Sequence, residues 1–128
     1  MIPLSPEHDA IARDIVDSAV AVHRTLGPGL LESVYEHCLA YELQSRGYRI
    51  DRQVALPVVY RDVCLEAGFR IDILVNDLVV MELKTVERLL PIHEAQLLTY
   101  LKLSGKRLGF LVNFNVPLIK EGIRRMAL

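Results

Sequence analysis

The sequence has little of what marks a secreted or membrane-bound protein. It contains only two cysteines, Cys38 and Cys64, and their spacing matches neither a metal-binding motif nor a disulfide framework. Charged residues interrupt every apolar run before it reaches the ~20 residues that span a bilayer. The N-terminus lacks the basic and then apolar stretches of a signal peptide. We therefore expect a cytoplasmic protein with reduced, buried thiols and no membrane contact.

Positive charge is also scarce for a protein that binds phosphates. Fifteen lysines and arginines stand against sixteen aspartates and glutamates, so the formal net charge is −1. A protein that holds DNA by its phosphates usually carries a basic surplus or a concentrated basic patch. The basic residues cluster at three places: Arg46, Arg49 and Arg52; Lys102, Lys106 and Arg107; Lys120, Arg124 and Arg125. Composition does not argue for nucleic acid, and we expect most of these charges to be solvated.

Apolar residues are plentiful. They make up 52% of the 128 residues, and the mean hydropathy is +0.27. A chain of this length has room for one domain with a real core, and it contains no repeat, linker or low-complexity segment. The apolar surplus suits a tight core and a contact between subunits. We therefore expect a single domain over residues 1–128 that forms a homo-oligomer, most simply a two-fold homodimer.

Helical periodicity dominates the N-terminal part of the chain. Ser5 followed by Pro6 is a typical helix start, and Gly27 ends the helix. Its predicted buried face consists of Ile11, Ile15, Ala19, Val22 and Leu26. A second helix is predicted from about Leu30 to Arg46, with Gly47 as its C-terminal stop. Its predicted buried residues are Leu31, Val34 and Cys38, with Leu39 and Leu43 as further candidates for the same face.

Strand-like patterns follow, and the chain therefore reads as an α/β protein. Strands are predicted over residues 54–60, 69–75, 78–84 and 107–114. Pro57 places the first strand at an edge or a bulge, and the apolar last strand reads as central. A third helix is predicted from Pro91 to Gly105. A short helix or coil is expected after Pro117.

Asp72 and Glu82 interrupt two strands that are otherwise apolar. Burying an unpaired carboxylate is expensive, so each needs a cation, hydrogen bonds or water. Opposed residues of an antiparallel hairpin have numbers with a constant sum, and they point to the same face. Asp72 faces Glu82 if Asn76-Asp77-Leu78 is a three-residue loop. A two-residue turn at Asn76-Asp77 would instead put Glu82 on the other face.

With Lys84, these carboxylates form a set suited to phosphate chemistry. Two carboxylates offer oxygen ligands to Mg²⁺ or Mn²⁺, which lowers the pKa of a water and neutralises charge on phosphorus. A lysine two residues beyond Glu82 can orient that water and stabilise the transition state. The alternative is a surface ion pair on a half-exposed strand.

At these residues the sequence resembles the PD-(D/E)XK nuclease superfamily. There an acidic residue on one strand precedes Glu-x-Lys on the next, as Asp72 precedes Glu82-Leu83-Lys84 here. The proline of the name is absent, because Ile71 precedes Asp72, but that proline carries no ligand. Gly29-Leu30-Leu31-Glu32-Ser33-Val34-Tyr35 resembles the motif of the GxxExxY proteins. The segment from Ile92 to Tyr100 resembles the Gln-x-x-x-Tyr helix of recombination exonucleases within the superfamily.

The resemblance implies a fold and a metal site. The fold would be a PD-(D/E)XK nuclease-like core of a helix, a three-stranded meander, a helix and a strand, with an extra N-terminal helix. The cofactor would be Mg²⁺ or Mn²⁺, held by Asp72 and Glu82 and completed by Glu32. Lys84 would be catalytic together with the three acids. Glu32 also suits a plain first-turn acid, which the helix dipole favours.

The resemblance also implies that Gln96 and Tyr100 touch the substrate. They lie four residues apart, on one helical face with His93. The same residues suit the polar rim of an amphipathic helix, and both interpretations stay open. Tyr35, one turn after Glu32, is expected to pack and not to take part in catalysis.

Two classes of function remain open. The first is a metal-dependent nuclease that hydrolyses phosphodiester bonds, with DNA favoured over RNA. The second is a non-catalytic nuclease-fold module that binds protein or nucleic acid, or a subunit of a larger nucleic-acid-processing complex. The intact set of Asp72, Glu82 and Lys84 favours the enzyme, while the near-neutral charge favours the alternatives.

Overall fold

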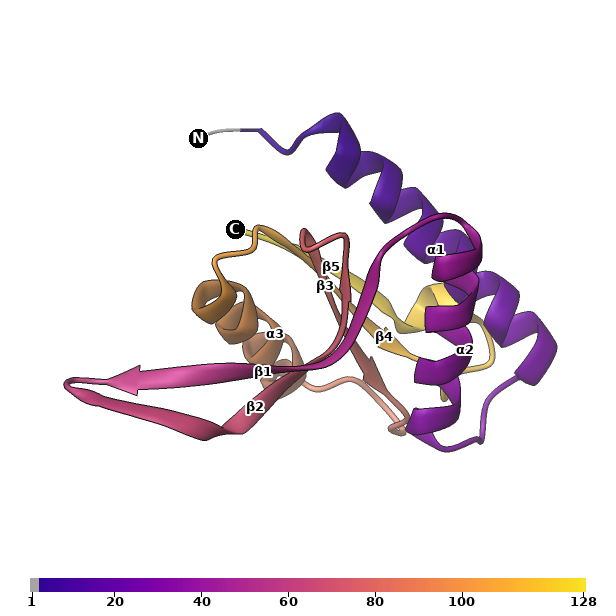
Figure 1. Cartoon of the computed structure of the whole chain (residues 1–128). Coiled ribbons are helices and arrows are strands. Elements are labelled where there is room, and N and C mark those ends of the chain that lie inside the picture. Colours follow the sequence, from indigo (N-terminus) through magenta and orange to yellow (C-terminus); the bar gives the residue numbers. More distant parts are fainter. Residues whose placement is uncertain (1–2) are drawn as a thin grey trace.

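The computed structural model describes residues 3–128, without the side chain of Ala67, and is built on a five-stranded mixed sheet (Figure 1). The strands are ordered along the sheet as in the sequence: β1 (Ile50–Tyr60), β2 (Val63–Val75), β3 (Val79–Lys84), β4 (Leu108–Asn113) and β5 (Ile123–Ala127). Only β3 and β4 pair in parallel. This α/β architecture confirms the predicted fold class.

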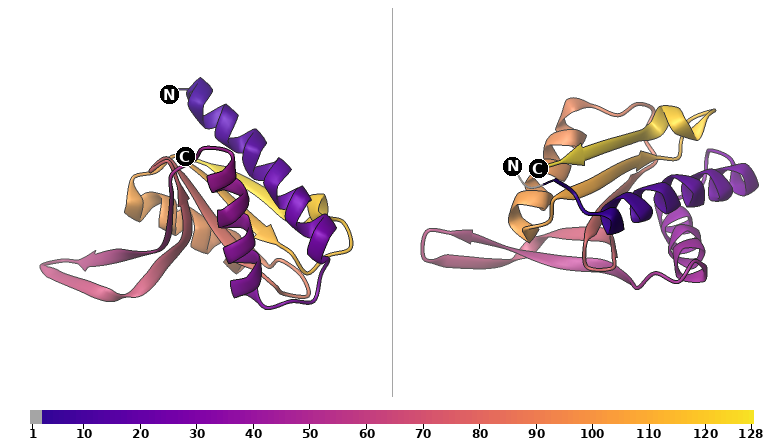
Figure 2. Two further views of the ribbon diagram at one scale, coloured as in Figure 1. Left: turned by 45° about the vertical axis from the view of Figure 1, so that its right-hand side comes forward. Right: turned by 90° about the horizontal axis from the view of Figure 1, so that it is seen from above.

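Helices cover both faces of the sheet (Figures 1 and 2). They are α1 (Pro6–Leu26), α2 (Glu32–Ser45) and α3 (Pro91–Ser104), with a short 3-10 turn, η1, at Ile119–Gly122. Helices α1 and α2 share one core with one face of the sheet, and α3 packs on a second core. Within residues 3–128, no helix has the length and apolar content needed to cross a bilayer.

Helix α1 forms as its sequence predicts. The Ser5 hydroxyl accepts a hydrogen bond from the His8 amide at 3.3 Å, and Pro6 occupies the first turn. The predicted apolar face is buried except for Leu26, which is half-buried. Gly27 ends the helix with a φ of 67°.

Helix α2 buries only part of the predicted face: Leu39, Leu43 and Tyr35 are buried as expected, but Cys38 is half-buried. Leu31 is 74% exposed and precedes the helix, and Val34 is also exposed. The buried positions are Tyr35, Glu36, Leu39, Ala40 and Leu43. The Tyr35 ring decides this orientation, because it stacks on Phe114 with 4.4 Å between ring centroids. This orientation also carries Glu36 inward.

Strands β1 and β2 are longer than predicted and continue beyond the sheet as a two-stranded arm (Figures 1 and 2). Glu66 and Gly68 interrupt the apolar pattern of the sequence, but β2 continues across them because it pairs with β1. Pro57 stands on an edge strand where the register shifts, as predicted. The expectation of buried cysteines is wrong, because Cys64 is exposed on the arm and Cys38 is half-buried; both are free thiols.

The C-terminal segment has the expected short helix after Pro117, as the 3-10 turn η1, and then a strand that was not expected. After η1, β5 pairs antiparallel with β4, whose other neighbour is β3. Arg124 and Arg125 are exposed residues of this edge strand. Because they are charged, the segment lacks the apolar pattern by which a strand is predicted. The pairing makes β4 an interior strand with every residue buried, as predicted.

Tyr35 gives a test of this packing. Its hydroxyl donates to the Gly27 carbonyl at 2.5 Å and accepts from the Leu30 amide at 3.2 Å. Tyr35→Phe leaves both backbone groups without this partner, so we expect a loss of about 1–3 kcal/mol in the free energy of unfolding, measured with urea. Tyr41→Phe on the exposed side of the same helix is the control and should cost almost nothing. Equal stabilities of the two variants would contradict this packing.

Candidate active site

The β2–β3 hairpin brings Asp72 and Glu82 together. Val75 pairs with Val79 and Ile73 with Met81, which leaves a three-residue loop and sets Asp72 opposite Glu82. Asn76 and Asp77 adopt left-handed φ angles of 51° and 54° in that loop, a region that these residue types tolerate. Of the two turns that the sequence allows, the structure has the longer one.

Beyond Ile73 and Met81, the side-chain carboxylates of Asp72 and Glu82 accept hydrogen bonds from backbone amides of the two strands. The Asp72 amide donates to Glu82 Oε1 at 3.2 Å, and the Leu83 amide donates to Asp72 Oδ2 at 2.8 Å. Glu82 is only 5% exposed, and Asp72 is half-buried. Neither forms an ion pair with any residue in the described range 3–128. The site therefore holds two acidic groups without a protein cation in contact.

Burial and mutual repulsion hold these groups toward their neutral forms. Burial, and then the charge of Asp72, raise the pKa of Glu82 to about 9, against the smaller effects of the Asp72 amide and Lys84. Burial also raises the pKa of Asp72, although the Leu83 amide opposes the shift. The pKa of Glu32 is raised by burial and by Asp72, and Lys84 lowers it. Glu32 and Lys84 therefore lie within electrostatic reach of the pair.

Helix α2 contributes a second acid that the sequence did not single out. Glu36, one turn after Glu32, is buried and accepts from Arg52 Nη2 at 2.8 Å and from Gln53 Nε2 at 2.5 Å. The same Gln53 nitrogen donates to Asp72 Oδ1 at 3.3 Å. The four-residue spacing of Glu32 and Glu36 was the available signal, because it places both on one helical face.

The strand that carries Lys84 is fixed where it leaves the sheet. The Lys84 carbonyl accepts from the Phe114 amide at 3.0 Å. Two residues further on, both backbone groups of Val86 bond to the buried Asn113 side chain, at 3.1 and 2.9 Å. The half-exposed Lys84 side chain thus extends from a rigid backbone.

Helix α3 places Tyr100 near the acids. Burial raises the pKa of Tyr100, and the charges of Glu82 and Asp72 raise it further. Tyr100 and Gln96 line a cavity of about 250 Å³ with Phe69, whose ring meets Tyr100 edge-on at 5.6 Å. His93 is used structurally, because its Nδ1 accepts from the Leu90 amide at 2.9 Å at the start of α3.

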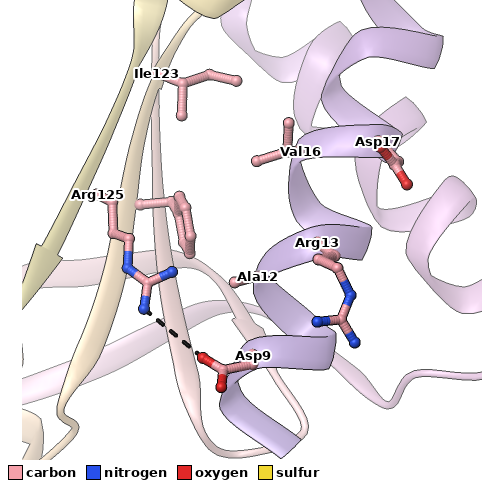
Figure 3. A pocket seen from close by; sticks show the side chains of 8 residues that line it. Asp9, Ala12, Arg13, Val16, Asp17, Ile123 and Arg125 are labelled. Carbon is pink, nitrogen blue, oxygen red and sulfur yellow. Dashed lines mark ion pairs between the residues drawn. The ribbon is translucent and has the colours of Figure 1, made fainter. Parts of the chain in front are cut away.

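A larger cavity, of about 590 Å³, lies between α1 and β5 and does not include the acidic pair (Figure 3). Asp9 and Asp17 are balanced there by Arg13 and Arg125, and Asp9 pairs with Arg125 at 4.0 Å. Because two acidic and two basic residues line this cavity, it favours neither anionic nor cationic ligands. The acidic pair remains the better candidate for chemistry.

The acidic pair fits a divalent cation that keeps part of its water shell. Among residues 3–128 there is no group of three His, Cys, Asp or Glu side chains arranged to hold a metal ion. Asp72 and Glu82 supply carboxylate oxygens from two side chains, and a cation would relieve their repulsion. Mg²⁺ is commonly bound by one or two carboxylates and several waters.

A family model described as the PD-(D/E)XK nuclease superfamily matches residues 9–126. The chain belongs to this superfamily. The match includes every predicted site residue from Glu32 to Tyr100. Membership links the protein to nuclease activity on nucleic acid, a chemistry for which PD-(D/E)XK proteins typically use divalent metals. No curated protein and no solved structure matches the chain significantly.

The raised pKa of Glu82 predicts how the stability of the metal-free PD-(D/E)XK domain depends on pH. The folded pKa of about 9 lies above the ordinary glutamate pKa of 4.5, so the folded protein binds the proton more tightly than the unfolded chain does. Stability should fall as the pH rises from 5 to 9, by at most about 1.4 kcal/mol per pH unit from this group.

Glu82→Gln tests this shift, because its amide oxygen can still accept from Asp72. With chelator present, the variant should match the wild type near pH 5 and exceed it in stability near pH 8, measured by urea unfolding. Parallel pH profiles for the two proteins would show that Glu82 ionises without penalty.

Proposed function

We propose that this PD-(D/E)XK protein hydrolyses phosphodiester bonds with the help of Mg²⁺ or Mn²⁺, with DNA favoured over RNA as substrate. The buried acidic pair beside Lys84 carries the proposal, because a buried pair of carboxylates without a cation is costly. Resemblance of the Gln96–Tyr100 helix to that of recombination exonucleases supports DNA. The Gly29–Tyr35 motif supports placement among the GxxExxY proteins. The free thiols of Cys38 and Cys64 suit the cytoplasm.

Each residue then has a distinct part. Asp72 and Glu82 would hold the ion, and Glu32, in the first turn of α2, would bind its waters. A bound ion of this kind makes water more acidic and neutralises charge that develops on phosphorus. Lys84 orients the attacking water and stabilises the transition state from its fixed backbone. The 250 Å³ cavity lets Gln96 and Tyr100 contact the substrate.

A second candidate function is binding without catalysis, as a module or as a subunit of a larger nucleic-acid-processing complex. One observation favours it, namely that acidic residues already pair with the basic cluster of Arg46, Arg49 and Arg52. Arg46 pairs with Asp14, Arg49 with Asp51 and Arg52 with Glu36, in a chain of net charge −1. Partners could then supply the positive charge that long nucleic acids require.

Cleavage assays separate the two. Wild-type protein with Mg²⁺ or Mn²⁺ should cut single-strand, duplex or branched DNA, and chelator should stop it. Lys84→Met should lower the rate about a hundredfold or more, since it removes one preorganised charge, while metal binding persists. Asp72→Asn should abolish both cleavage and the rise in melting temperature that metal causes.

Asp72→Asn also controls for contaminating nuclease. A wild type that binds DNA but cuts none of these substrates with either metal would support the binding module. An Asp72→Asn protein that keeps the full metal-induced thermal shift would place the metal elsewhere.

We also propose that the protein is a homodimer held by the β1–β2 arm. Tyr60, Val63 and Leu65 share one face of this arm and are 62%, 54% and 49% exposed. A two-stranded hairpin is marginally stable in water by itself. Contact with a second copy about a two-fold axis would bury these side chains and leave the acidic pair accessible.

Light scattering at micromolar concentration should give twice the 14.5 kDa mass of the chain. Val63→Glu combined with Leu65→Glu should give the monomer mass, because it places four like charges in the interface. Tyr41→Glu, at an exposed apolar residue of α2, is the control and should stay dimeric. A wild type of monomer mass would contradict the proposal.

A further inference from the structure

Gln53 has a backbone conformation that glutamine rarely adopts. Its φ of 51° lies in the left-handed region, although it stands inside β1 between residues that pair regularly with β2. Arg52 pairs with Ile73 and Val54 with Ile71, so Gln53 stands opposite Asp72. Such a conformation costs on the order of 1–3 kcal/mol and persists only where the surroundings impose it.

The side chain of Gln53 bridges two acids. Its Nε2 donates to Glu36 Oε1 at 2.5 Å and to Asp72 Oδ1 at 3.3 Å. Glu36 Oε2 is already bonded to Arg52, through Nε at 3.0 Å and Nη2 at 2.8 Å. The neutral amide of Gln53 therefore connects the Arg52–Glu36 ion pair to Asp72, whose carboxylate has no cation in contact.

We propose that Gln53 is a positioning residue, which orients the Asp72 carboxylate toward the metal ion. This inference rests on the proposed function. The Leu83 amide holds Asp72 Oδ2 at 2.8 Å, and Gln53 holds Oδ1. Each carboxylate oxygen can accept more than one bond, so both keep capacity for a cation. Hydrogen bonds to a ligand fix its direction, and their loss typically weakens metal binding 10- to 100-fold.

The strain at Gln53 separates this role from a purely structural one. Glycine adopts a positive φ without the steric cost that a side chain brings, so the backbone would be more relaxed with glycine at position 53. Glu36 does not depend on Gln53 for its charge balance, because Arg52 supplies it. The contact that distinguishes glutamine here is the one with Asp72.

Calorimetric titration of the intact protein with MnCl₂ tests the role. Gln53→Gly should weaken Mn²⁺ binding roughly 10- to 100-fold, while the melting temperature without metal stays equal to that of the wild type or rises. Gln53→Met keeps the side-chain length and the strained backbone but removes the donor. It should lose the same affinity as Gln53→Gly.

Asn76→Gly is the matched control. Asn76 has the same φ of 51°, and its side chain accepts from the Arg49 amide at 2.8 Å, away from the acids. This variant should bind Mn²⁺ as the wild type does.

The possible failures are distinguishable. Wild-type affinity in both Gln53 variants would overturn the positioning role and leave the proposed function intact. A fall in melting temperature of Gln53→Gly with unchanged affinity would make Gln53 structural. A wild type that binds no Mn²⁺ would overturn the proposed function and this inference together.

Discussion

The carboxylate of Glu82, buried beside that of Asp72, is the constraint on which the site depends. Two acids in a poorly solvated place repel each other, and the cost of ionising both can reach several kcal/mol. Three fixed dipoles donate hydrogen bonds to these carboxylates: the backbone amides of Asp72 and Leu83 and the side-chain amide of Gln53. These donors orient the oxygens without supplying a full positive charge. The proposed divalent cation would supply the positive charge that these donors lack.

Pattern reasoning succeeded where local geometry has few solutions. The β2–β3 loop could have two residues or three, and side chains alternate between faces along a strand. Only the three-residue loop sets Glu82 opposite Asp72, and the structure has that loop. The cap at Ser5 and the bulge near Pro57 follow from similarly narrow rules. Each of these features depends on residues that are close in the sequence.

The features that escaped prediction depend on contacts between distant segments. The stacking of Tyr35 on Phe114 accompanies the unexpected exposure of Leu31 and Val34, and β5 pairs with the far edge of β4. The bridge from Glu36 through Gln53 to Asp72 joins a helix and two strands. Nothing in the local sequence around Gln53 indicates its strained backbone, because glutamine ordinarily avoids it.

Helix α2 couples the core to the chemistry. Glu32 and Glu36 flank Tyr35, whose ring is held flat against Phe114, and the Phe114 amide binds the carbonyl of Lys84. One aromatic stack therefore sets the distance between the acids of the helix and the lysine of the strand. A substitution that disrupts this stack would change the spacing between Glu32 and Lys84 in the proposed site. In a screen for lost activity, core substitutions at Tyr35 and Phe114 would be hard to tell from substitutions of the proposed catalytic groups.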